Sequence, residues 1–223
     1  MELIASSISK IHELEARYGR PKNSVSLLAV SKKKPPEQII KAANLGILHF
    51  GENYVQEALE KIKRLRGLSL KWHYIGSIQS NKTREIAQSF DWVQSLDREK
   101  IAYKLNEHRG NSLRALNVCV QVNLSDEENK SGVPINQAEG LCGLIEELPN
   151  LKLRGLMAIP APQPDFQLQR IKFRELSRKF SDLKTNHPNI DILSMGMSSD
   201  FEAAIAEGST MIRLGTALFG ARI

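Results

Sequence analysis

Cysteine is scarce in this sequence, and long apolar runs are absent. Cys119 and Cys142 are the only cysteines; both lie in apolar segments, and neither belongs to a CxxC pair or a Cys/His cluster. This pattern excludes a disulfide framework and does not indicate a metal site. No stretch reaches the ~20 apolar residues of a transmembrane helix, and residues 1–19 show amphipathic helical spacing rather than a signal-peptide core. We therefore expect buried, reduced thiols, a cytoplasmic location and no membrane partner.

The basic residues are not concentrated on one obvious segment. The sequence has 31 Lys and Arg against 25 Asp and Glu, a formal net charge of +6, and such an excess favours an anionic partner only if it gathers on one face. The densest basic segment, "EKIKRLRG" at 60–67, has apolar residues at helical spacing. We interpret its basic residues, Lys61 among them, as a solvated helix face. No nucleic-acid-binding motif accompanies the charge, so we expect no nucleic-acid partner.

Short β-prone runs alternate with segments of helical periodicity. Eight such runs occur: "SLLAVSK", "LHFGEN", "WHYIGS", "WVQSL", "NVCVQVNLS", "LRGLMAIP", "ILSMGMS" and "MIRLGTALFG". This alternation predicts a parallel sheet built from βαβ units. No GxGxxG or GxxxxGK[ST] motif follows the first run, which disfavours an open doubly wound sheet. Eight units in 223 residues fit a lean barrel. We predict an α/β fold, a single TIM-type (β/α)8 barrel domain over 1–223 with an extra N-terminal helix, 1–20, packed on the barrel.

Three consecutive lysines follow the first predicted strand. Functional groups of such barrels gather at the C-terminal ends of the strands, and strand alternation puts Leu28, Val30 and Lys32 on the inward face. Lys33 has the opposite parity. A lysine partly removed from water loses some preference for its charged form, and the free amine can attack a carbonyl. The alternative is an ordinary solvated charge run.

The ends of the last two predicted strands resemble a phosphate-binding corner. Barrel enzymes often bind phosphate with the loops after strands seven and eight. Strand seven ends "SMGMSSDFEAAIAEG", where Ser199 and Glu202 form a predicted capping box and Ser198 could join the turn's backbone amides in an anion cradle. Strand eight ends "IRLGTALFG", where Gly215 lets the backbone approach a ligand and Thr216 offers a hydroxyl. An ordinary helix cap and an ordinary strand-end glycine are the alternatives.

An aldehyde-reactive lysine and a phosphate cradle are two of the groups that hold pyridoxal 5′-phosphate (PLP). The third requirement is a partner for the pyridine nitrogen. Arg213 precedes Gly215 by two residues; a guanidinium can donate a hydrogen bond to that nitrogen but cannot accept its proton. A structural salt bridge with a glutamate is the alternative role of Arg213.

These motifs together resemble a known family. "LLAVSKKKP", "FGENYVQE", "WHYIGSIQSNK", "KSG", "RGLMAIP" and "SMGMSSDFEAAIAEGSTMIRLGTALFG" are similar, in order and over about 27–222, to the pyridoxal phosphate homeostasis proteins, relatives of the alanine racemase N-terminal barrel. The resemblance implies a Schiff base on Lys32, phosphate binding by Ser198, Gly215 and Thr216, Arg213 at the pyridine nitrogen and Asn53 near the cofactor. Lys33 departs from the family, which commonly has threonine there.

The resemblance implies a cofactor-binding protein that supports vitamin B6 and amino-acid balance. Racemisation needs a base on each face of the substrate, and the second domain that supplies one in alanine racemases is not expected after Ile223. We therefore expect a PLP carrier, a monomer that could supply apo-enzymes, and we assign no catalytic residue. The alternatives are a weak PLP-dependent racemase using Tyr54, Tyr74 or water as the opposite acid, and a nucleic-acid or protein adaptor.

Two further residues are tempting but receive no role. His73 lies in mid-strand in "WHYIG", where a histidine is more often a satisfied core residue. Lys130 in "KSG" follows the fifth strand and could meet an anion, although a solvated loop lysine is the favoured interpretation.

Overall fold

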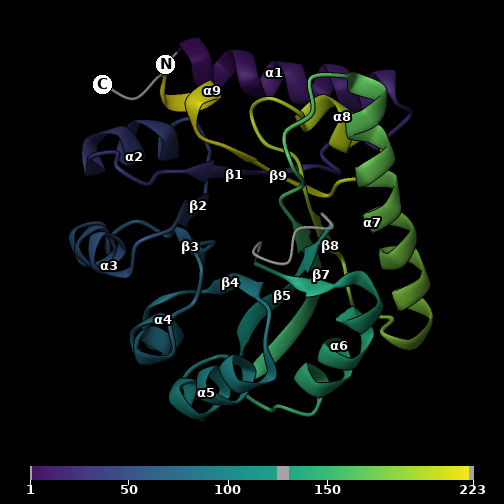
Figure 1. Ribbon diagram of the computed structural model, residues 1–223. Helices are drawn as coiled ribbons and strands as arrows, with labels where there is room; N and C mark the ends of the chain where they lie inside the picture. Colours follow the sequence, from purple (N-terminus) through teal and green to yellow (C-terminus); the bar gives the residue numbers. More distant parts are fainter. Residues whose placement is uncertain (1, 125–130, 221–223) are drawn as a thin grey trace.

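The computed structural model describes residues 2–124 and 131–220, and within them eight parallel strands close into a barrel (Figure 1). Neighbouring strands follow the order β4, β3, β2, β1, β9, β8, β7, β5, and pairing between β4 and β5 closes the ring. The predicted (β/α)8 barrel is confirmed. Its strands are β1 (Ser26–Val30), β2 (His49–Glu52), β3 (Lys71–Tyr74), β4 (Trp92–Leu96), β5 (Leu116–Asn123), β7 (Leu151–Ala158), β8 (Ile192–Ser194) and β9 (Met211–Leu214). A two-residue strand, β6 (Val133–Pro134), pairs with the end of β5.

Helices connect the strands and surround the barrel (Figure 1). Their starts follow ordinary local rules: α2 opens on Pro36, and the Asp165 carboxylate caps α7 by accepting from the Leu168 N–H at 2.9 Å. The helices are α1 (Glu2–Arg17), α2 (Pro36–Ala43), α3 (Val55–Arg64), α4 (Thr83–Ser89), α5 (Glu99–Arg109), α6 (Ala138–Glu146), α7 (Phe166–Asn186), α8 (Phe201–Ala206) and α9 (Thr216–Phe219), with 3₁₀ turns η1 (Ser80–Lys82) and η2 (Ile135–Gln137).

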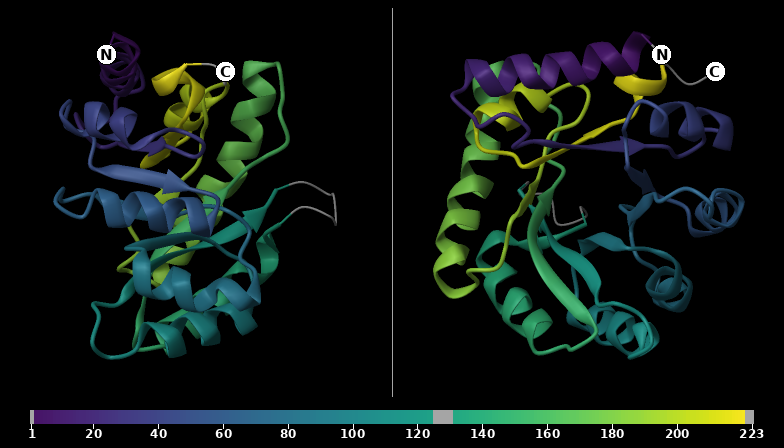
Figure 2. Two further views of the ribbon diagram at one scale, coloured as in Figure 1. Left: turned by 90° about the vertical axis from the view of Figure 1, so that its left-hand side faces the viewer. Right: turned by 180° about the vertical axis from the view of Figure 1, so that it is seen from behind.

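The extra N-terminal helix lies beside the two shortest helices. Figure 2 shows α1 running across the same end of the molecule as α8 and α9, which have only six and four residues. Arg17 and the Tyr18 hydroxyl both donate to the Glu202 carboxylate, at 2.9 and 3.0 Å. The Ser7 hydroxyl donates to the Ala217 carbonyl at 3.4 Å. The helix thus lies against a part of the barrel wall where the connecting helices are short.

The core has two parts that the strands separate. A large apolar cluster, here called the shell, lies between the strands and the helices and includes Ala29 and Phe173. A small cluster inside the barrel consists of Leu28, Trp92, Cys119, Met157, Ile192 and Met211. Leu28 and Ala29 therefore face opposite sides of β1, as alternation requires.

Both cysteines are buried free thiols, as predicted. Cys119 lies inside the barrel and Cys142 lies in the shell. Burial raises the pKa of both thiols, that of Cys142 to about 12. Within the described ranges no helix is both long and apolar enough to span a bilayer, and those ranges hold no group of three or more His, Cys, Asp or Glu arranged to bind a metal ion.

One sequence interpretation is wrong in a way that matters for the site. Lys61, assigned to a solvated helix face, is only 5 % exposed. Its neighbours Lys63, Arg64 and Arg66 are exposed, as expected. Helical spacing places Lys61 on the buried side of α3, where an ion pair compensates for the loss of solvent.

Candidate functional site

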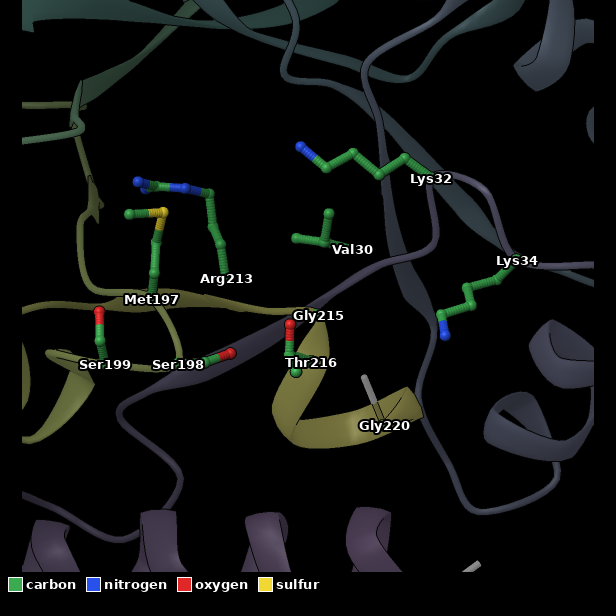
Figure 3. Close-up of a pocket in the computed structure, with 10 residues that line it drawn as sticks. All are labelled: Val30, Lys32, Lys34, Met197, Ser198, Ser199, Arg213, Gly215, Thr216 and Gly220. Atoms are coloured by element: carbon green, nitrogen blue, oxygen red, sulfur yellow. The ribbon is translucent and has the colours of Figure 1, made fainter. Parts of the chain in front are cut away.

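A pocket opens where β1 and β9 end (Figure 3). Its volume is about 370 Å³, within the usual range for small-molecule sites. Its described lining consists of Val30, Lys32, Lys34, Met197, Ser198, Ser199, Arg213, Gly215, Thr216 and Gly220. Three of these side chains are basic and none is acidic, so the lining favours an anionic ligand.

The three consecutive lysines have three different surroundings. β1 ends at Val30, and 31–34 form a turn closed by the Lys34 N–H donating to the Ser31 carbonyl at 3.0 Å. Lys32 extends into the pocket toward the space that Arg213 also enters (Figure 3). Lys33 is exposed, with a left-handed φ of 61°. Lys34 points away from Lys32 in Figure 3. The predicted directions of Lys32 and Lys33 are thus found, although a turn produces them, not a longer strand.

The turn is held from behind by a buried ion pair that sequence reasoning missed. The Lys61 ammonium donates to the Ser31 carbonyl at 2.7 Å and to the carboxylates of Glu52 and Glu57 at 2.7 and 2.6 Å. Glu57 also accepts from the Lys33 N–H, and Glu52 accepts from the Ser31 hydroxyl. Desolvation raises the pKa of Glu52 despite these hydrogen bonds. The helical i,i+4 spacing of Glu57 and Lys61 was a usable signal; the contact with Glu52 was not.

Arg213 lies in β9 and is almost completely buried, at 3 % exposure. Its two terminal nitrogens donate to the Ser194 hydroxyl at 2.9 Å and to the Ala158 carbonyl at 2.8 Å. Burial lowers the pKa of this guanidinium to about 10, with the nearby Asp200 acting in the opposite direction. Across the described residues no glutamate forms a salt bridge with Arg213, so the alternative role is not supported.

The predicted phosphate corner forms the floor of the pocket. Ser198 and Thr216 both line it, and the Ser198 hydroxyl accepts from the Ala217 N–H at 3.4 Å. A Cβ added at Gly215 would meet only Val30, at an ordinary 3.5 Å, and the φ of Gly215 is −117°. Neither packing nor backbone strain therefore demands glycine, whereas a side chain would fill the pocket floor.

The predicted capping box is absent. α8 begins at Phe201, its N-cap is Asp200, and no side chain caps it. The Asp200 carboxylate instead accepts from the Met197 N–H at 2.6 Å, which holds the turn before the helix. The pattern of Ser199 followed three residues later by Glu202 was misleading because Glu202 pairs with α1.

Asn53 lies outside the pocket formed by the other five predicted residues. It follows β2, and its carbonyl comes within 2.3 Å of the position that a Cβ on Gly76 would occupy, so the approach of these two loops requires glycine there. The side-chain oxygen of Asn53 is buried and has no hydrogen-bond partner. His73 is a fully buried core histidine, as expected, and Lys130 lies outside the described residues.

The chain is similar in sequence to known proteins over nearly its whole length. The family model for the alanine racemase N-terminal domain matches 10–223. The pyridoxal phosphate homeostasis protein of Escherichia coli K12 is 49% identical over 222 residues, which are 98% of this chain and 95% of that protein. The protein of the same name from Haemophilus influenzae is 53% identical over 217 residues, 96% of this chain and 92% of that protein.

Solved structures show the same fold. PipY of Synechococcus elongatus with PLP bound superposes with a TM-score of 0.82 at 36% identity, covering 94% of this chain and 100% of PipY. The alanine racemase of Corynebacterium glutamicum shares the fold alone, with a TM-score of 0.68 at 18% identity, covering 100% of this chain and 62% of the racemase. From its sequence identity over nearly the full length, this chain belongs to the pyridoxal phosphate homeostasis protein family.

Proposed function

We propose that this chain binds PLP in the pocket between β1 and β9 and serves intracellular PLP and amino-acid homeostasis as a cofactor-binding protein. Support comes from one arrangement above all. Lys32 and Arg213 extend into the same space above a floor made by Ser198, Gly215 and Thr216, with no carboxylate among the described lining residues. The PLP-bound PipY structure, whose fold covers almost all of this chain, supports the same ligand.

The lining residues fit the chemical groups of this cofactor. The hydroxyls of Ser198 and Thr216 can donate to a phosphate, and Gly215 leaves room for it. Lys32 supplies an amine for the aldehyde; condensation forms a carbon–nitrogen double bond and releases the aldehyde oxygen as water, after the ammonium has lost a proton. Asn53, with its unpaired buried oxygen, is a further candidate contact on the neighbouring strand end.

Arg213 limits the chemistry that the bound cofactor can supply. PLP acts as an electron sink, and the sink is strongest when an acidic partner keeps the pyridine nitrogen protonated. A guanidinium can only donate a hydrogen bond to that nitrogen, so it does not keep the nitrogen protonated as an acidic partner would. Holding the cofactor, not turning over amino acids, is therefore the function that these residues favour.

Borohydride reduction followed by peptide mass mapping tests the proposal, with a visible absorption spectrum taken beforehand. Reduction fixes the link to the amine, so a pyridoxyl group should appear on the peptide that contains Lys32. A colourless protein with no adduct after incubation with excess PLP would refute the proposal.

A weak racemase remains the second candidate, and the described geometry gives it little support. Neither Tyr54 nor Tyr74 is among the described residues that line the pocket. The Tyr74 hydroxyl donates to the Ser77 carbonyl at 3.1 Å, and burial raises its pKa. Entry of solvent deuterium at the α-position of amino acids would support a racemase, and none across a broad panel would exclude it.

Three further features of the proposed function have separate tests. A monomeric state is measurable by light scattering during gel filtration, and transfer to apo-enzymes by recovery of their activity. We also propose a cytoplasmic location, which the two buried free thiols support and which cell fractionation can check. An adaptor role through the +6 charge would require salt-sensitive retention on DNA or RNA, which we do not expect.

A further inference from the structure

A line of five polar side chains crosses the interior of the barrel and ends at the pocket. Consecutive members are joined by hydrogen bonds of 2.8, 2.9, 2.6 and 2.9 Å. The members, in spatial order, are His49, His73, Gln94, Ser194 and Arg213. We call this set the interior chain. Each member lies on a different strand, and only Arg213 belongs to the pocket.

The chemistry of its last member gives the interior chain one direction. Arg213 can only donate, so the Ser194 oxygen accepts and its hydroxyl hydrogen turns to the Gln94 side-chain oxygen. Gln94 then presents its amide nitrogen to Nδ1 of His73, which must accept. The hydrogen of neutral His73 therefore lies on Nε2 and is donated to Nδ1 of His49. The donor-only guanidinium and the orientation of the Gln94 amide together determine the direction of the four hydrogen bonds.

A second contact fixes the orientation of the Gln94 amide. Its nitrogen also donates to Sδ of Met211 at 3.1 Å, so both amide hydrogens have acceptors. Turning the amide over would set its oxygen against the acceptor atoms of His73 and Met211. The same turn would put the NH₂ group opposite Ser194 and remove the oxygen that accepts the Ser194 hydroxyl hydrogen.

Burial makes this arrangement costly to break. His73, Gln94 and Ser194 have no exposed surface. A buried polar group that loses its hydrogen-bond partner strongly destabilises the folded protein. Desolvation, reinforced by the neighbouring His49 and Arg154, holds the pKa of His73 well below its usual range. The ring of His73 is also stacked on Trp92, with centroids 4.9 Å apart. The neutral acceptor that Gln94 needs is therefore maintained.

We propose that Gln94 and His73 are positioning residues for Arg213, which orient the guanidinium toward the ligand through the Ser194 hydroxyl. With one terminal nitrogen held by Ser194 and the other by the Ala158 carbonyl, the guanidinium plane is fixed from two sides. Without Gln94, the Ser194 hydroxyl hydrogen loses its acceptor. The hydroxyl can then rotate, and its oxygen no longer stays in place to accept from Arg213. This inference rests on the proposed function, since it deepens the role of Arg213 in the PLP pocket.

The test compares Gln94→Met with Gln121→Met. Gln121 is the matched control because it is also a buried glutamine of a barrel strand, but it bonds to the Ser131 carbonyl and not to the interior chain. We expect Gln94→Met to raise the Kd for PLP about tenfold, because the loss of one hydrogen bond that supports a charged group changes a dissociation constant by about that factor. The pH dependence of the bound cofactor's visible absorption should also shift.

Graded variants separate positioning from simple loss of stability. Ser194→Ala should match Gln94→Met, His73→Phe should raise the Kd about threefold because Gln94 still reaches Ser194, and Gln121→Met should leave Kd and spectrum unchanged. Melting temperatures are measured for every variant. The proposal would be overturned if the changes in Kd and spectrum simply scaled with the drop in melting temperature in every variant, Gln121→Met included.

A measurement without cofactor keeps this test separate from that of the proposed function. Side-chain ¹⁵N NMR of the cofactor-free protein should show His73 and His49 as Nε2–H tautomers. Gln94→Met should change the signals of His73 and of the Arg213 guanidinium together. If the wild type fails to bind PLP but shows these tautomers, the proposed function fails and the interior chain stands. An Nδ1–H tautomer at His73 would overturn the proposed hydrogen-bond directions of the interior chain.

Discussion

The two sides of the barrel wall differ sharply in composition. The shell between strands and helices is a continuous apolar cluster in which Phe50, Phe90 and Phe173 are almost completely buried. The interior combines six apolar residues with the polar interior chain that ends at Arg213. Apolar burial supplies most of the favourable free energy of folding, so the shell can stabilise the barrel while the interior carries directional, less stabilising contacts. The following predictions test this division, beginning with the largest expected effect.

Lys32→Ala should abolish the borohydride-fixed pyridoxyl adduct completely. The free energy of unfolding should change by less than about 0.5 kcal/mol, because one side chain at the rim contributes little to the core. Mass mapping and urea unfolding measure the two effects. Lys33→Ala, in the same turn but exposed, is the control and should keep the adduct. Unfolding of Lys32→Ala would mean that Lys32 has a structural role.

Phe173→Ala should lower the free energy of unfolding by about 3–5 kcal/mol, since it opens a cavity in the shell. The absorption spectrum of the bound cofactor should not change. Urea unfolding followed by circular dichroism measures the loss. Ile171 lies on the same helix and is 54% exposed, so Ile171→Ala should cost less than about 0.5 kcal/mol. A shift of the cofactor spectrum in Phe173→Ala would show that packing in the shell affects the pocket, contrary to the division between shell and interior.

Lys61→Met should lower the free energy of unfolding by about 3 kcal/mol, because it leaves the Glu52 carboxylate buried without its ion-pair partner. PLP binding should also weaken, since Lys61 holds the carbonyl of Ser31 in the lysine turn. Adding Glu52→Gln should restore part of the stability by removing the orphaned charge. Exposed Lys63 provides the control, and equal losses for Lys63→Met would remove any special role for the buried pair.

Acidification should destabilise the protein through the interior chain. Burial lowers the pKa of His73 and, to a lesser extent, of His49. Below about pH 6.5 the unfolded state therefore binds more protons than the folded state, and stability falls as pH falls. The raised pKa values of Glu52, Asp97 and Asp200 act in the opposite direction, because those groups bind protons more readily in the folded state.

The contribution of His73 is isolated by difference. Urea unfolding measures the free energy of unfolding between pH 8 and pH 5. This free energy should fall less on acidification for His73→Phe than for the wild type. Asp91 offsets the lowered pKa of His49, whereas Lys71 and Arg154 reinforce it. Identical pH slopes in the two proteins would mean that His73 does not titrate differently on folding.

The cysteines should give the smallest response, with no reaction toward a thiol reagent in the native protein. Both thiols are buried and their pKa values are raised, so little thiolate is exposed to attack. Both should react once guanidinium unfolds the chain. Rapid labelling of Cys119 in the native state would show that the barrel interior opens readily.

Much of the fold could be predicted because its signals are local. Each of the eight β-prone runs overlaps a barrel strand, since periodicity and strand length are properties of short segments. Lys32 and the residues after β8 and β9 were found because strand ends of a barrel meet at one face. That 1–223 form one domain stays a prediction, which limited proteolysis can test.

The wrong or missing predictions concern contacts that tertiary packing decides. The buried position of Lys61 depends on Glu52 from another element, and Glu202 pairs with α1 instead of capping α8. Gln94 and Ser194 are 100 positions apart in sequence, and neither carries a local signal. Asn53 is not among the described residues that line the pocket, and its position near the cofactor stays a prediction.

The sequence by itself determined the alternation of strands and helices, and it predicted the lysine and the hydroxyls of the proposed PLP site, because each depends on a short pattern. Only the tertiary structure decided which polar groups meet. Closing the barrel brings His73, Gln94 and Ser194 into line with Arg213. The direction of those hydrogen bonds then follows from a guanidinium that can only donate and from a Gln94 amide whose nitrogen also contacts Met211.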